Sequence, residues 1–171
     1  MKRTKQTQFG FTLIEIILYL GIMMVIVGSV SAFSALLLSA RAKAHTILEV
    51  EQQGTAILQL MSATIRGSDG INAPQAGTSA SSLSLDVKES ADDPTVFDIA
   101  SGIMRMSEGT GTPQTLNTSN LTVTELLFSN ATPDGAPGSV KFEFTITHLN
   151  PENRNEYNYV KTFYGTASLR Y

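Results

Sequence analysis

The feature that most constrains this chain is a long apolar run from Phe11 to Ala40. Apart from the phenol of Tyr19, its only ionisable side chain is Glu15. At about 1.5 Å of rise per helical residue, the run is long enough to cross a hydrocarbon core of about 30 Å. A carboxylate in such a segment costs about 2.5–3.5 kcal/mol near the helix centre and less near the interface, so an unpaired Glu15 needs a reason. The run therefore predicts a membrane-spanning helix with one acid near its start.

The basic residues at the N-terminus predict how this helix is oriented. Lys2, Arg3 and Lys5 precede Gly10, and the positive-inside rule places them on the cytoplasmic side. The C-terminal part then lies outside, in a single-pass topology. A secretory signal peptide would have an apolar core of only about 7–15 residues, followed by a cleavage site. A cut after Gly10 would instead leave the whole apolar run on the mature chain.

One hexapeptide stands between the basic leader and the apolar run. It comprises Gly10, Phe11, Thr12, Leu13, Ile14 and Glu15. This arrangement resembles the type IV prepilin and pseudopilin family. The resemblance implies that a prepilin peptidase recognises Gly10, Phe11, Thr12, Leu13 and Glu15, cuts between Gly10 and Phe11, and N-methylates Phe11. Residues 1–10 are then a leader peptide, and glycine before the cut suits an extended backbone in a protease site.

The resemblance also implies a role for Glu15 in subunit assembly. In that family the acid at this place is thought to neutralise the α-amino group of an adjacent subunit, because a lone carboxylate in a low-dielectric filament core is strongly penalised. Carried over, Glu15 and the amine of Phe11 form an ion pair between subunits. The alternative is that Glu15 reaches back to the lipid headgroups, although that behaviour suits the longer Lys and Arg better.

The helical pattern continues beyond the apolar run. Apolar or small residues recur at steps of three and four, with Glu49, Glu51 and glutamines on the other side. This stripe comprises Ile47, Val50, Gly54, Ile57 or Leu58, Met61 and Ile65. Gly67 or Gly70 ends the helix, because either can adopt the left-handed conformation that closes one. We therefore expect one helix in which 11–40 spans the membrane or lies in a filament core, and 41–67 is an amphipathic continuation.

After this helix the pattern changes to that of strands. Residues 72–82 are rich in Pro, Gly, Ala, Ser and Thr and predict a linker or exposed loop. Alternating or β-branched segments predict strands at 82–87, 95–99, 103–106, 121–128, 140–147 and 157–169. The expected fold class is α+β: a long N-terminal α-helix packed on a C-terminal antiparallel β-sheet, with a loop and a pilin-like head domain over 68–171.

Composition argues against several other classes of function. Three of the twelve basic residues precede Gly10, so the rest of the chain carries nine basic and fifteen acidic residues, which does not indicate a nucleic-acid-binding surface. Cysteine is absent and histidine occurs twice, so we expect no disulfide, thiolate metal site or His-rich site. No catalytic triad order or nucleotide-binding glycine loop occurs, and we expect neither an enzyme nor a cofactor.

One acidic group could in principle supply oxygen ligands to calcium, as the resemblance to pseudopilins suggests. It comprises Glu89, Asp92, Asp93 and Asp98. Because the group lacks the spacing of an EF-hand loop, we expect a solvated loop and no metal site.

Two functions are consistent with these features. The first is a structural subunit of a type IV pilus, a type II secretion pseudopilus or a DNA-uptake filament, whose partners are the prepilin peptidase, other pilin subunits and the inner-membrane assembly machinery. Only the DNA-uptake filament would bring nucleic acid as a partner. The absence of cysteine, and of proline before Pro74, favours a minor pilin or pseudopilin over a major pilin. The alternative is a membrane-anchored extracytoplasmic module that binds a ligand without polymerising.

Overall fold

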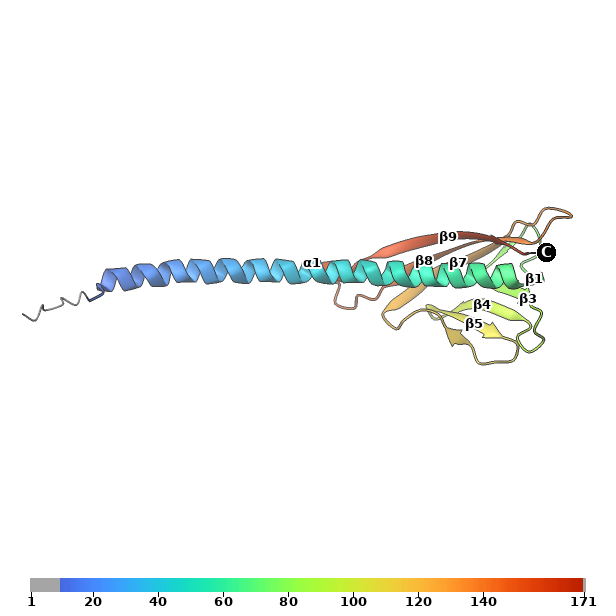
Figure 1. The fold of residues 1–171 in the computed structure, drawn as a ribbon, viewed down its shortest axis with the longest axis horizontal. Helices are drawn as coiled ribbons and strands as arrows, with labels where there is room; N and C mark the ends of the chain where they lie inside the picture. The colour runs from blue at the N-terminus through green and yellow to red at the C-terminus, as the bar shows by residue number, and fades with distance from the viewer. Residues whose placement is uncertain (1–9, 171) are drawn as a thin grey trace, which may run out of the picture. The chain divides into compact units, whose positions relative to one another are not determined.

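A single long helix, α1, runs over Leu13–Gly67 (Figure 1). The computed structural model describes residues 10–170, and the chain divides into two compact units between Arg41 and Ala42. No proline interrupts α1, and residues of good helix propensity fill most of it. The expected continuous helix is confirmed, but it starts at Leu13 and not at Phe11, because Thr12 takes the N-cap position, whose backbone is not helical.

The second half of α1 buries one face. Its buried residues recur at steps of three and four and are Thr46, Val50, Gly54, Ile57, Met61 and Ile65. The predicted stripe is confirmed except at its first member, Ile47, which is only half-buried. Thr46 takes that place because it lies four residues before Val50 on the same face. Its hydroxyl donates to the carbonyl of Ala42 (3.0 Å), so no buried donor is left unpaired there.

Two antiparallel sheets complete the C-terminal unit, which begins at Ala42 and which we call the head. The first sheet has the order β1 (Gly70–Ala73), β3 (Leu83–Asp86), β4 (Thr95–Ala100), β5 (Ile103–Glu108) and β6 (Gln114–Thr115). The second has the order β2 (Ser79–Ala80), β7 (Leu121–Asn130), β8 (Ser139–His148) and β9 (Val160–Ser168). The α+β class is confirmed, while the single expected sheet is in fact two.

Most predicted strands agree with the structure to within two residues at each end, but two segments differ more, and the short strand β6 was not predicted. Residues 72–82, predicted as a linker or exposed loop, include the end of β1 and all of β2. Ser79 and Ala80 pair with β7 through their main chain, which does not require apolar side chains. The last strand begins at Val160 and not at Tyr157, because Asn155–Tyr157 form a short 3-10 helix, η1.

One apolar core joins α1 to both sheets. Val50, Ile57, Met61 and Ile65 of α1 belong to the same buried cluster as residues of the first sheet, such as Phe97, and of the second sheet. Figure 1 shows the head portion of α1 running beside β7, β8 and β9. The strand with the clearest alternation, β8, buries the predicted side chains Val140, Phe142, Phe144 and Ile146.

The backbone of α1 approaches β9 closely at Gly54. The ring of Phe163 occupies the space that a Cβ atom at Gly54 would need. This ring also stacks on Phe144, with centroids 5.3 Å apart. A glycine at this turn of the helix therefore allows an aromatic pair to sit between helix and sheet.

Substitution of Gly54 tests this packing. Gly54→Ala places a methyl group against the Phe163 ring, and we expect overpacking to destabilise the head by about 1–3 kcal/mol, measured by chemical denaturation of the full chain in detergent. The matched control is Gly67→Ala, where no atom lies near the added methyl group and helix propensity improves. Equal stability of the two variants would contradict the close packing at Gly54.

Candidate functional site

The predicted cleavage point lies just outside α1. Gly10 and Phe11 precede the helix and are exposed, with Phe11 exposing 74% of its surface. Among the described residues, no atom beyond the chain neighbours of Gly10 lies within 4 Å of the position that a Cβ there would take. In the described part of the chain, the bond between Gly10 and Phe11 is thus exposed and not held in a helix. The other predicted leader residues, Lys2, Arg3 and Lys5 among them, lie outside the described residues.

Thr12 begins the helix as its N-cap. Its carbonyl accepts the main-chain N–H groups of Glu15 (3.1 Å) and Ile16 (3.2 Å), and its hydroxyl lies 3.4 Å from the same Glu15 nitrogen. Threonine is a favoured N-cap because its oxygen satisfies a free N–H of the first turn. The predicted recognition residues Thr12 and Leu13 therefore fix where the helix starts.

Glu15 has a partner that the sequence reasoning missed. The hydroxyl of Tyr19, one turn further along, donates to Oε1 of Glu15 (3.1 Å). The Tyr19 ring also meets the ring of Phe11 edge-to-face, with centroids 6.4 Å apart. Glu15 and Tyr19 thus share a helix face, since they lie four residues apart, and Phe11 contacts Tyr19 from just before the helix. The spacing of an acid and a tyrosine at i and i+4 could have predicted this bond.

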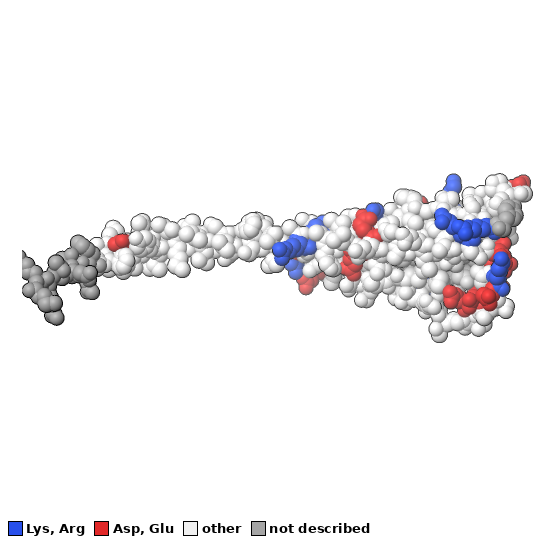
Figure 2. Space-filling view, in the orientation of Figure 1, with Lys and Arg blue, Asp and Glu red and all other residues white. Residues whose placement is uncertain are grey.

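The surface of α1 between Leu13 and Ala40 is uncovered and apolar. The helix is long and apolar enough to cross a membrane, and none of its most apolar stretch is buried. Figure 2 shows a white surface along this part of the helix, with one acidic side chain near its start. The hydroxyls of Ser29, Ser34 and Ser39 donate to carbonyls one turn earlier, at 2.7, 2.8 and 2.9 Å. Such internal bonds suit hydroxyls that face lipid or other helices.

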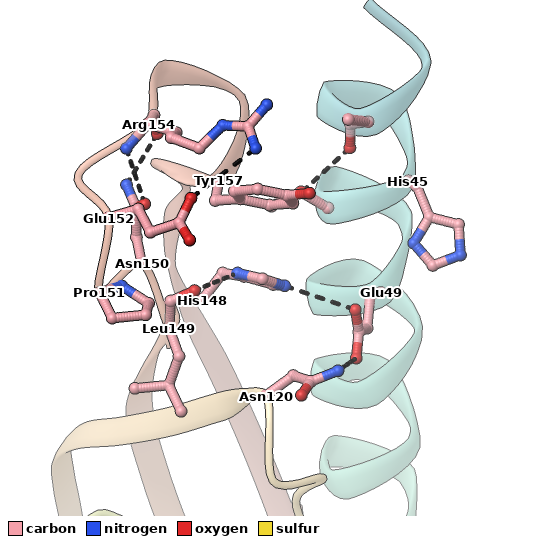
Figure 3. Close-up of a pocket in the computed structure, with 12 residues that line it drawn as sticks. His45, Glu49, Asn120, His148, Leu149, Asn150, Pro151, Glu152, Arg154 and Tyr157 are labelled. Atoms are coloured by element: carbon pink, nitrogen blue, oxygen red, sulfur yellow. Dashed lines mark hydrogen bonds and ion pairs between the residues drawn. The ribbon is translucent and has the colours of Figure 1, made fainter. Parts of the chain in front are cut away.

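A cleft in the head, which sequence reasoning did not identify, lies between α1 and the loop that joins β8 to β9 (Figure 3). Its cavity has a volume of about 510 Å³. Nε2 of His148 lies 3.5 Å from Oε2 of Glu49, and Nδ1 lies 2.8 Å from the carbonyl of Leu149. The His148 ring stacks on Tyr157, with centroids 5.6 Å apart. Asn120 contributes a long contact to Glu49 (3.5 Å).

The polar groups of this cleft are engaged with one another. Both ring nitrogens of His148 lie beside acceptors, Oε2 of Glu49 and the carbonyl of Leu149, so this side chain bridges β8 and α1. Arg154 packs over Tyr157 and pairs with Glu156. Among the described residues, no group of three His, Asp or Glu side chains is placed to hold a metal ion. The contacts of these lining residues therefore hold the β8–β9 loop against the helix.

The acids considered as calcium ligands do not act together. Asp98 forms a two-point pair with Arg105, at 2.8 and 2.7 Å. Asp93 lies 3.4 Å from the main-chain nitrogen of Val87. Because Asp98 is neutralised on the sheet, the group cannot present all its oxygens to one cation.

A second polar cluster joins α1 to β9. Nζ of Lys161 donates to both carboxylate oxygens of Glu51, at 2.5 and 2.6 Å, and the hydroxyl of Tyr159 donates to Oε1 at 3.1 Å. The bond from Lys161 lowers the pKa of Glu51, against the opposing effect of burial. Burial, with the bond to Glu51, raises the pKa of Tyr159. Nearby, Lys43 donates to the carbonyl of Asn158 (2.6 Å).

Comparison with protein-family models, with curated proteins and with solved structures gave no match to this chain. Its function must therefore be argued from its own residues. Three features of the described chain bear on its function. They are the exposed Gly10–Phe11 bond, a capped helix with an uncovered apolar surface, and the acid Glu15 on that surface.

The pKa of Glu51 leads to a prediction about acid stability. A lowered pKa in the folded head means that Glu51 stabilises it above the ordinary value of 4.5, and that this stabilisation is lost as the pH falls through the lowered pKa. We expect Glu51→Gln to be less stable than the natural chain at about pH 7, with the difference shrinking at about pH 3. Urea denaturation at both pH values measures this, with Glu89→Gln on an exposed loop as control. A difference that grows on acidification would contradict the assignment.

Proposed function

We propose that this chain is a filament subunit related to type IV pilins, most like a minor pilin or pseudopilin. It enters the cytoplasmic membrane through α1, with Lys2, Arg3 and Lys5 inside and the head outside. A prepilin peptidase then cuts between Gly10 and Phe11 and methylates the new amine. The mature chain moves from lipid into a filament whose core is formed by copies of α1, and the filament lies in the periplasm or outside the cell.

The observation that supports this proposal most directly is the uncovered surface of α1. A helix that exposes apolar side chains from Leu13 to Ala40 is unfavourable in water. Each Å² of apolar surface that stays in contact with water forgoes about 25 cal/mol of hydrophobic free energy. Lipid covers such a helix, and so do other helices of the same kind. A simple anchor would not need an acid within this surface, whereas a subunit that pairs with a neighbour's amine would.

Glu15 can accept that amine without losing its bond to Tyr19. The Tyr19 hydroxyl donates to Oε1, and Oε2 has no hydrogen-bond partner within residues 10–170, so it can accept a charged N–H. In lipid, Tyr19 gives the carboxylate a donor before assembly, which reduces the cost of keeping it there. On assembly, the α-ammonium of Phe11 from an adjacent subunit neutralises the remaining charge. Removal of the leader creates this amine, so processing and assembly depend on the same six residues.

The mass of the assembled protein tests the proposal. Filaments sheared from cells, or the complex extracted from the membrane, should contain a chain that begins at Phe11, lacks Met1–Gly10 and carries one added methyl group. Intact-mass spectrometry measures this directly, with cells that lack the prepilin peptidase as the control, where the full chain should persist in the membrane. Assembled material that retains Met1–Gly10 would overturn the proposal.

A further inference from the structure

The outer edge of β9 is open to pairing with another strand. β9 lies at the margin of the second sheet and pairs only with β8, in a register that runs without a bulge from Ser139 opposite Ser168 to Thr147 opposite Val160 (Figure 1). A long, regular edge strand is a template for pairing, because its outward N–H and C=O groups lack partners.

The direction of the main-chain groups follows from two hydrogen bonds. The nitrogen of His148 donates to the carbonyl of Tyr159 (3.1 Å), and the nitrogen of Leu169 donates to the carbonyl of Gly138 (2.8 Å). The main-chain N–H and C=O groups of odd-numbered residues in this strand therefore point toward β8. Those of even-numbered residues point away from it, since the direction alternates along a strand. The residues that face away are Val160, Thr162, Tyr164, Thr166 and Ser168. Within residues 10–170, these five make no other main-chain hydrogen bond.

The other sheet edges carry the protections expected of a soluble protein. The other edge of the second sheet is β2, which is only two residues long, and beyond it β7 has a bulge between Val123 and Glu125, where the nitrogen of Val123 donates to the carbonyl of Gly102 (2.9 Å). β1 ends immediately before Pro74. β6 is only two residues long. Short strands, bulges, prolines and covering segments all block edge pairing, so β9 differs from these three edges.

The side chains of β9 offer no such protection. The five residues whose main-chain groups point outward are uncharged, and the central one, Tyr164, exposes 70% of its surface. The only charged residue of the strand, Lys161, is bonded to Glu51 of α1. Proline is absent from β9. The strand thus lacks the outward charge or proline that would discourage a partner strand.

We propose that β9 pairs antiparallel with β9 of a second copy of this chain, about a two-fold axis at Tyr164. This register uses all five outward residues, whereas a centre at Thr162 or Thr166 uses fewer. It sets Tyr164 beside Tyr164 of the second copy, Thr162 beside Thr166, and Val160 beside Ser168. Aromatic and threonine pairs are favourable across antiparallel strands, and no like charges meet. The two four-stranded sheets become one continuous sheet with an isologous interface.

The direction of β9 determines which copies meet in this way. β9 runs in the same direction as the head portion of α1, because Lys43 contacts Asn158 and Gly54 contacts Phe163. In an antiparallel pair of β9 strands the two head helices therefore run antiparallel. Two heads whose portions of α1 run parallel cannot form the pair. It joins heads that approach from opposite directions, such as those of two filaments, and so goes beyond the role of a subunit within one filament.

Spin labels test both the contact and its register. The chain has no cysteine, so single nitroxides can be attached at Tyr164→Cys or Ser168→Cys in the full chain in detergent. Double electron–electron resonance should give a separation below about 20 Å for label 164. For label 168 it should give about 27 Å or more, because residue 168 lies opposite residue 160 at about 3.4 Å per residue. Association through α1 alone would not make the separation shorter for label 164 than for label 168. The absence of a short separation for label 164 would overturn the proposal.

Two lysine variants separate edge pairing from general effects on the sheet. With the label at 168, Tyr164→Lys places two like charges opposite each other on the axis, and the 27 Å component should be lost. Thr147→Lys puts the same charge on the same face of the inner strand β8, where the component should persist. Retention of the component in Tyr164→Lys, or its loss in both variants while circular dichroism shows folded heads, would overturn the proposal.

Discussion

The apolar surface of α1 between Leu13 and Ala40 is the constraint on which the rest of this chain depends. Exposing so large an apolar surface to water is unfavourable, and no other described part of the chain covers it. In the proposed function, lipid and then other copies of the helix cover this surface. In either environment the carboxylate of Glu15 needs a hydrogen-bond donor, and Tyr19 is the donor that the chain itself provides.

The acids of the helix fall into two groups with different partners. Glu49 and Glu51, in the head portion of α1, contact His148 and Lys161 of the same head. They hold the helix against the second sheet, together with the close packing at Gly54. Glu15 has a different kind of partner, the neutral hydroxyl of Tyr19 on the same helix. The same helix therefore has one portion that is satisfied within the subunit and another that is completed by its surroundings.

Local patterns predicted much of this structure, and contacts between distant residues account for what they missed. The helix, its buried stripe and the alternation of β8 follow from the spacing of apolar residues within one segment. The division into two sheets, the pairing of Ser79 with Ser129 and the bridge from His148 to Glu49 depend on residues far apart in the sequence, which a single sequence does not bring together. At the start of α1, the motif predicts roles for Thr12 and Glu15, whereas the bond from Tyr19 to Glu15 follows from the spacing of four residues in a helix.

Crosslinking between copies of α1 tests the central claim, that other copies of this helix replace lipid around it. A single cysteine at Ala35 in the otherwise cysteine-free chain would report contact in assembled material. We predict disulfide-linked dimers under mild oxidation, with a yield that falls at least tenfold in Glu15→Ala, while a cysteine at Lys88 on an exposed head loop gives none. A protein that only anchors a binding module would give a crosslink yield no higher than random collisions in the membrane produce. That result would contradict the account, and so would a yield that Glu15→Ala leaves unchanged.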